Sequence, residues 1–235
     1  MLTCWLAAPA SAASLTVLAP ASATPGLKAL AAQFSAKTGT TVTVGGGGRD
    51  KVFEALRTGA PADVVVLPTT DLTETPRTTG MTPLGHIVVG VGVQAGAKVP
   101  DISTPEKFRA VLLAARGVAY ADPKAGTSAG KIIDQMLSAP GFARVKRVPV
   151  QGLAIGALLS GKADIALQML PELAGNKDVA LAGPVPEIYG ASVDFSAAIA
   201  VQTIDAVEAQ AFITFLTDPH NAPVWKNNGL TSRGY

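Results

Sequence analysis

The residues best suited to chemistry in this sequence lie in one stretch, 45–51, which reads Gly-Gly-Gly-Gly-Arg-Asp-Lys. It follows a β-type run at 41–44 and precedes a helical pattern, so the accessible N–H groups of Gly47 and Gly48 would lie at a helix N-terminus. Arg49 adds a planar, permanently charged guanidinium at the same place. This combination predicts anion binding, although a flexible glycine turn beside an exposed arginine is the simpler alternative. The spacing of a Walker loop is absent.

Other kinds of chemistry find little support among the residue types. His86 and His220 are the only histidines, and no group of His, Asp and Glu has metal-ligand spacing, so we expect neither a metal nor another cofactor. A Gly-x-Ser-x-Gly elbow and a complete dinucleotide fingerprint are also missing. Asp50, Lys51, His86 and Glu172 are candidates for proton transfer, but each is more simply read as a capping, hydrogen-bonded or solvated side chain. We therefore predict no catalytic residue.

The composition indicates a folded protein with a sizeable core. Of the 235 residues, 48% are hydrophobic and only 15% are charged, which suits one large domain or two small ones. The net charge is +2 and the 19 Lys and Arg residues are scattered, which argues against nucleic acid as a partner. An aromatic content of 5% also argues against a surface that stacks bases.

Residues 1–13 resemble the end of a secretory signal peptide. A short apolar run is followed by Ala10-Ser11-Ala12, a small-x-small cleavage site, although a basic region is missing. Cleavage there would remove Cys4, the single cysteine, and the alternative is an ordinary apolar N-terminal segment. No other run approaches the ~18 apolar residues of a membrane helix. We expect an exported, periplasmic protein.

From residue 14 onward, strand and helix patterns alternate. Strands are predicted at 15–18, 41–44, 62–67, 86–93, 117–121, 147–150, 163–168, 179–182 and 193–201. Helices are predicted at 27–37, from the glycine stretch to about 58, and at 71–80, 106–115, 127–138, 153–160, 205–216 and 221–228. This alternation indicates parallel sheets with right-handed crossovers.

The predicted elements fall into two βαβ-type halves. The long strands at 86–93 and 193–201 bracket the second half, so they would cross between two lobes as a hinge. Lobe I would comprise 14–86 and 199–235, and lobe II would comprise 87–198. Such a hinge allows closure around a ligand.

Five motifs recur in the order and spacing of a known family: 15–24 (LTVLAPASAT), 59–63 (GAPAD), 121–130 (ADPKAGTSAG), 156–165 (GALLSGKADI) and 212–219 (FITFLTDP). On these motifs the sequence resembles the periplasmic molybdate-binding proteins of ABC importers. The resemblance implies the type II periplasmic binding fold, an α/β structure with two parallel-type sheets joined by two hinge strands. It also implies a protein that closes over a small anion and delivers it to a membrane permease. We expect a monomer.

The resemblance also implies positions for the ligand, at strand-to-helix turns of both lobes. These positions are Ser22, Ala23, Gly47, Gly48 and Arg49 in lobe I and Thr127, Ser128, Ala129, Ala154 and Gln168 in lobe II. Ser22 and Thr127 could instead be helix caps. Three departures from the family pattern stand out. Arg49 lies where the family has a serine-rich loop, and Pro68 lacks an N–H. The position of a ligand-binding tyrosine falls near Gln168 or Met169.

These departures bear on the identity of the ligand. An arginine pairs bidentately with a planar carboxylate, so we predict an organic carboxylate, with a molybdate- or tungstate-type oxyanion left open. One branch resembling this family is enzymatic, the aconitate isomerases, and an isomerase of a small polycarboxylate is the alternative function. A sensor read by a partner protein is a third reading.

Overall fold

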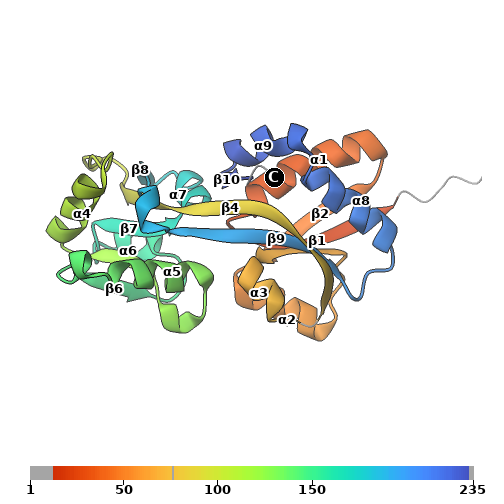
Figure 1. Cartoon of the computed structure of the whole chain (residues 1–235), viewed down its shortest axis with the longest axis horizontal. Coiled ribbons are helices and arrows are strands. Elements are labelled where there is room, and N and C mark those ends of the chain that lie inside the picture. Colours follow the sequence, from red (N-terminus) through yellow and green to blue (C-terminus); the bar gives the residue numbers. More distant parts are fainter. Residues whose placement is uncertain (1–12, 76, 233–235) are drawn as a thin grey trace, which may run out of the picture.

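The computed structural model describes residues 13–75 and 77–232, and it contains two bodies joined by two long strands (Figure 1). We call the body that contains residues 14–73 and 206–231 lobe I, and the body that contains residues 105–189 lobe II. The predicted signal remnant lies outside the described residues, except for Ala13. None of the described helices has the length and apolar character needed to cross a membrane.

Lobe I and the crossing strands are built from twelve described elements. The strands are β1 (Ser14–Pro20), β2 (Thr41–Gly47), β3 (Val64–Pro68), β4 (Thr78–Gln94), β9 (Ser192–Ala200) and β10 (Leu230–Thr231). The helices are α1 (Thr24–Thr38), α2 (Arg49–Thr58), α3 (Thr69–Thr73), α8 (Ala206–Leu216), η4 (Pro219–Asn221) and α9 (Ala222–Asn227).

Lobe II is built from the chain between the crossing strands. Its strands are β5 (Val118–Ala121), β6 (Arg147–Val150), β7 (Ile165–Met169) and β8 (Val179–Pro184). Its helices are α4 (Pro105–Ala114), η1 (Pro123–Ala125), α5 (Ser128–Leu137), η2 (Pro140–Phe142), α6 (Ile155–Leu159), α7 (Leu170–Ala174) and η3 (Glu187–Tyr189).

Both lobes have a parallel core of three strands. β1 pairs in parallel with β2 and β3, and β5 pairs in parallel with β6 and β7. The full strand order is β2-β1-β3-β9-β4-β7-β5-β6, with β8 and β10 also pairing with β4. The α/β prediction is therefore confirmed, but the two parallel cores belong to one connected path, because β4 pairs with strands of both lobes.

β4 is the element that the sequence pattern predicted least well. A helix at 71–80 and a strand at 86–93 were expected, whereas α3 ends at Thr73 and β4 already begins at Thr78. Threonine is β-branched and favours strands. The early part of β4 pairs with β9 through two irregular stretches, at 79–82 and 83–85, and these accommodate Pro83 within a strand. The crossing strand is therefore much longer than its apolar part.

The glycine stretch is partly strand rather than loop, which corrects the predicted end of β2 at residue 44. Gly45, Gly46 and Gly47 continue β2 in register with Leu18, Ala19 and Pro20 of β1. A Cβ atom at Gly46 would lie 2.3 Å from the Ala19 carbonyl oxygen, and φ is +129° there, so the sheet itself requires this glycine. Only Gly48 remains between β2 and α2.

Aromatic side chains fill the core of each lobe. In lobe I the rings of Phe34 and Phe212 pack edge to face with centroids 5.1 Å apart. In lobe II, Phe142 packs against Tyr189 in the same way at 5.2 Å. These rings belong to one hydrophobic cluster that runs through both lobes and helps to hold the turns at the strand ends in place.

Candidate functional site

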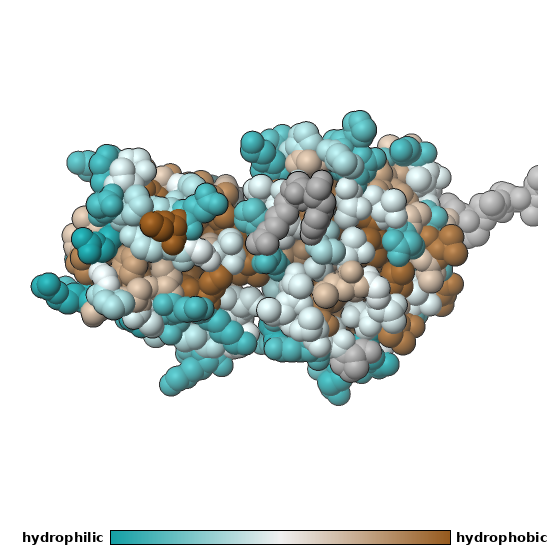
Figure 2. All heavy atoms as spheres, in the orientation of Figure 1, coloured by the Kyte–Doolittle hydropathy of each residue, from teal (hydrophilic) through white to brown (hydrophobic). Residues whose placement is uncertain are grey.

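The strand-to-helix turns of lobe I meet at one edge because β1, β2 and β3 are parallel. The N–H of Ala21, just after β1, donates to the carbonyl of Gly47 at 3.2 Å, which ties the first turn to the second. The third turn, after Pro68, follows β3 on the other side of β1. The surface is indented between the lobes, and hydrophilic residues lie on both sides of the indentation (Figure 2).

Ser22 lies in the first of these turns, is only 5% exposed, and makes no side-chain hydrogen bond with the described residues. Helix α1 begins with Ala23 as its N-cap, and no side chain caps it. The capping role that the sequence left open for Ser22 is therefore not the one it has in the structure. The Ser22 hydroxyl is not among the fully buried unpaired polar atoms of the described residues, so it stays accessible and is free to donate to a ligand.

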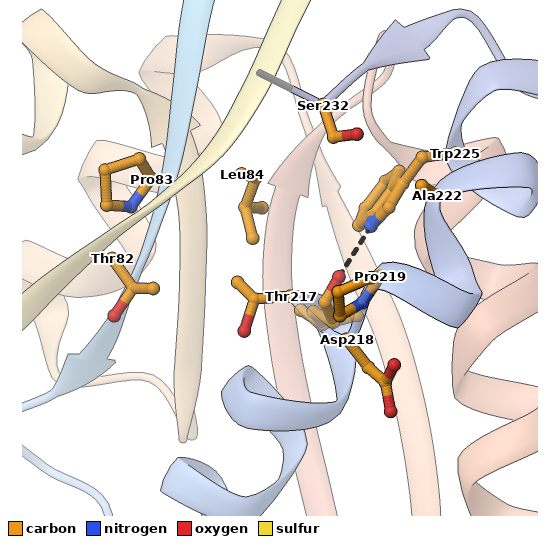
Figure 3. Close-up of a pocket in the computed structure, with 10 residues that line it drawn as sticks. Thr82, Pro83, Leu84, Thr217, Asp218, Pro219, Ala222, Trp225 and Ser232 are labelled. Carbon is orange, nitrogen blue, oxygen red and sulfur yellow. Dashed lines mark hydrogen bonds between the residues drawn. The ribbon is translucent and has the colours of Figure 1, made fainter. Parts of the chain in front are cut away.

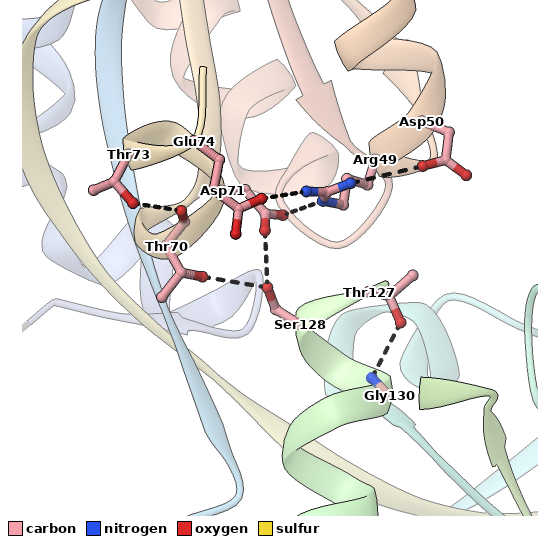
Figure 4. Close-up of polar contacts among 9 residues, drawn as sticks. All are labelled: Arg49, Asp50, Thr70, Asp71, Thr73, Glu74, Thr127, Ser128 and Gly130. Carbon is pink, nitrogen blue, oxygen red and sulfur yellow. Dashed lines mark hydrogen bonds and ion pairs between the residues drawn. The ribbon is translucent and has the colours of Figure 1, made fainter. Parts of the chain in front are cut away.

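Arg49 is surrounded by carboxylates (Figure 4). Its Nη2 lies 2.7 Å from Glu74 Oε2, its Nε lies 3.2 Å from Asp71 Oδ2, and its Nη1 lies 3.9 Å from Asp50 Oδ1. Its guanidinium also stacks 4.1 Å from the ring centre of Phe53. The open guanidinium that the sequence suggested is thus occupied by the protein's own acids, whereas no side chain caps the N–H groups at the start of α2.

Thr127 and Ser128 have different roles at the start of α5. Thr127 is the N-cap, and its Oγ1 accepts a bond from the N–H of Gly130 at 3.1 Å. The Ser128 hydroxyl reaches lobe I, where it donates to Asp71 Oδ1 at 3.3 Å and lies 3.5 Å from Thr70 Oγ1. The backbone N–H groups of Ser128 and Ala129 donate to none of the described residues.

Gln168 and Ala154 are engaged with one another. The N–H of Ala154 donates to Gln168 Oε1 at 2.8 Å, and Gln168 Nε2 donates to the carboxylate of Glu172. These two bonds satisfy both ends of the Gln168 amide, although the residue is only 5% exposed. Burial raises the pKa of the Glu172 carboxyl, and the bond from Gln168 opposes this shift.

The structure therefore divides the ten predicted positions into two groups, one of eight and one of two. Ser22 and Ala23, Gly47 and Gly48 with Arg49, and Thr127 to Ala129 lie at the facing edges of the lobes, and the Ser128–Asp71 contact joins these edges. Ala154 and Gln168 bond to one another. Their part in binding, like that of the others, stays a prediction.

Asp71 is the residue at this edge that the sequence interpretation missed. It follows β3 on α3, its side chain is 3% exposed, and it contacts both Arg49 and Ser128. Burial raises the pKa of its carboxyl, while the Arg49 guanidinium and the Ser128 hydroxyl partly offset the rise. Its position directly behind a buried parallel strand was a signal that could have placed it at the edge.

Two of the candidates for proton transfer lie elsewhere. His86 is in β4, opposite Asp194 of β9 and Thr231 of β10, and its Nδ1 is buried. Glu172 is held by Gln168. No group of His, Cys, Asp and Glu suited to a metal ion occurs among residues 13–75 and 77–232.

A separate cavity of about 450 Å³ lies in lobe I between β4, the end of α8 and α9 (Figure 3). Leu84 and Trp225 line it, and the Trp225 indole N–H donates to the carbonyl of Leu216 at 2.9 Å. None of the predicted site residues lines this cavity. Its one charged lining residue is Asp218, whose carboxylate would repel an anion, so the cavity does not compete with the interlobe edge as an anion site.

Two α/β lobes with facing strand-to-helix turns define a ligand-binding architecture. The family model described as bacterial extracellular solute-binding protein matches residues 15–231, and the chain belongs to this family. No curated protein sequence matches the chain.

Solved structures of similar fold cover almost all of the chain. The substrate-binding domain of a putative molybdenum ABC transporter from Clostridium difficile has a TM-score of 0.73 at 15% identity, covering 95% of this chain and 100% of the other. The periplasmic molybdate-binding protein of Azotobacter vinelandii has a TM-score of 0.72 at 20% identity, with coverage of 94% and 100%. A sulfate-binding protein of Mycobacterium tuberculosis has a TM-score of 0.70 at 17% identity, with coverage of 94% and 87%. At these identities the likeness establishes the fold, which confirms the resemblance seen in the sequence.

Proposed function

We propose that this protein is a periplasmic solute-binding protein that closes over a small anion between its lobes and delivers it to the permease of an ABC importer. The observation that carries the proposal is Ser22 at the edge of lobe I, a largely buried residue whose hydroxyl is accessible and bonds to none of the described residues. The uncapped N-terminus of α2 lies beside it, since Ala21 bonds to Gly47.

Among anions, we place a tetrahedral oxyanion ahead of an organic carboxylate. A planar carboxylate is best recognised by a guanidinium, and that of Arg49 is already paired with Asp71 and Glu74. The donors that are free before any acid is displaced are neutral: the Ser22 hydroxyl, the first N–H groups of α2, and those of Ser128 and Ala129. Ligands named for proteins of similar fold, molybdate and sulfate, support this order.

The test is a calorimetric titration of the full chain with molybdate, tungstate, sulfate, phosphate, citrate and aconitate. We expect one of the oxyanions to bind with a stoichiometry near one. Ser22→Ala should weaken that binding at least tenfold, which corresponds to about 1.4 kcal/mol, and leave the melting temperature unchanged.

Ser35→Ala is the matched control. Ser35 is also on α1, but at its far end, where its hydroxyl accepts from the N–H of Val42 at 3.3 Å. This variant should bind as the wild type does. Equal affinities for Ser22→Ala and the wild type would remove Ser22 from the site, and a failure of every anion to bind would overturn the proposed function.

A further inference from the structure

The Asp71 carboxylate connects the two lobes. On the side of lobe I its Oδ2 lies 3.2 Å from Nε of Arg49, and toward lobe II its Oδ1 accepts a hydrogen bond of 3.3 Å from the Ser128 hydroxyl (Figure 4). The Asp71 side chain is 3% exposed, so the carboxylate itself is largely shielded from water. A single carboxylate therefore takes a cation from one lobe and a hydroxyl from the other.

These are the contacts that an anion captured between the lobes would make. The arrangement is not a simple surface ion pair, because the second partner of Asp71 belongs to the opposite lobe. Glu74 provides a contrast: it binds the same arginine at 2.7 Å, but it is exposed and has no described contact with lobe II. Asp71 alone among the acids around Arg49 thus occupies the interlobe position.

The local charge makes this arrangement unfavourable for a second anion. Arg49 contributes +1, and Asp50, Asp71 and Glu74 contribute −3 when ionised, so the cluster carries a formal charge of −2. Repulsion between an incoming anion and Asp71 is strong because the carboxylate is buried, where screening by water and salt is weak. An anion gains Arg49 and Ser128 only when Asp71 releases them.

We infer that Asp71 is an internal competitor for the bound anion, which holds the lobes together in the absence of ligand and sets the affinity and selectivity of the site. This inference rests on the proposed function and adds a specificity-determining residue to it. An anion that binds must therefore form stronger interactions with both lobes than the Asp71 carboxylate does.

Asp71→Asn tests the competition directly. Asparagine keeps the shape and an acceptor for Ser128 but lacks the charge that holds Arg49 and repels an anion. In calorimetric titrations of the full chain with molybdate and sulfate, we expect this variant to bind at least tenfold more tightly than the wild type. Glu74→Gln removes one charge from the same arginine without touching the interlobe contact, and its affinity should change less than threefold.

The ligand-free protein offers a second readout that needs no anion. Spin labels are placed at Glu54→Cys on α2 and Lys131→Cys on α5, both exposed, in a chain with Cys4→Ser. Pulsed electron–electron double resonance then measures the distance between the two labels, one on each lobe. Asp71→Ala, which removes both contacts, should lengthen or broaden the distance distribution, and Glu74→Gln should leave it unchanged.

The two readouts separate the possible failures. If neither the wild type nor Asp71→Asn binds an anion, the proposed function and the competitor role both fail, and the distance measurement alone decides whether Asp71 joins the lobes. If the wild type binds but Asp71→Asn binds equally or more weakly, the competitor role is overturned while the proposed function stands. A purely structural ion pair would give that second result, together with a lower melting temperature.

Discussion

Replacing Glu172 by glutamine should stabilise the protein at neutral pH. The Glu172 carboxylate is partly buried at the start of α7, and it accepts a hydrogen bond from Gln168. No Lys or Arg of the described chain forms an ion pair with it. Glutamine keeps an acceptor for Gln168 and carries no charge, so the variant avoids the cost of desolvating a carboxylate.

The sign and the size of the effect follow from burial. Because burial raises the pKa of Glu172 in the folded protein, the folded state binds this proton more tightly than the unfolded state does. Stability is therefore lost as the pH rises above the ordinary value of 4.5 and through the raised pKa. The cost of burying the charge is partly offset by the bond from Gln168, which leaves a net gain of about 1 kcal/mol for Glu172→Gln.

Thermal unfolding followed by circular dichroism between pH 4 and pH 8 measures this difference. At pH 7 the variant should melt roughly 2–4 °C above the wild type, and the two should converge toward pH 4. Glu187→Gln is the control, because Glu187 is an exposed glutamate of the same lobe. A variant that melts below the wild type at pH 7, or a difference that does not depend on pH, would refute the assignment of an unpaired buried charge.

Two further predictions concern packing and ionisation. Gly26→Ala should destabilise the protein by about 1–3 kcal/mol in urea unfolding, because its Cβ would lie 2.5 Å from a ring carbon of buried Trp225. Gly156→Ala, whose Cβ would meet nothing within 4 Å, should not. Burial and the hydrogen bond to Asp134 raise the pKa of Tyr120 to about 12. Absorbance titration at alkaline pH should therefore show one late-ionising tyrosine, and this step should disappear in Tyr120→Phe.

Much of the fold could be predicted because its signals are local. The β-branched run at 62–67 predicted β3, found at Val64–Pro68, and the apolar stretches at 86–93 and 193–201 predicted parts of the two crossing strands. The early start of β4 was missed because it depends on pairing with β9, far along the chain. Local propensity carries no information about such a partner.

The candidate site could be predicted in position but not in detail. The turns at residues 22 and 47–49 follow from parallel strands that end at one edge. The surroundings of Arg49 could not be inferred in the same way, since Asp71 and Glu74 approach it only once α3 packs beside α2. The contact between Ser128 and Asp71 depends further on how the two lobes face each other. Side-chain pairing across a fold is set by tertiary packing rather than by sequence spacing.

The way β9 is shared between the lobes has a consequence for the order in which the chain folds. Lobe II is formed by one continuous segment. In lobe I, by contrast, β3 pairs with β9, so that Val64 of β3 lies opposite Ile199 of β9. During synthesis from the N-terminus, all strands of lobe II are therefore available for pairing before the sheet of lobe I can be completed. In lobe I, β3 cannot pair with β9 until residue 200 has been synthesised, so one side of β3 stays unpaired until then. This strand is fully apolar over Val64–Leu67. This apolar strand is therefore exposed on one side of the growing chain during that interval.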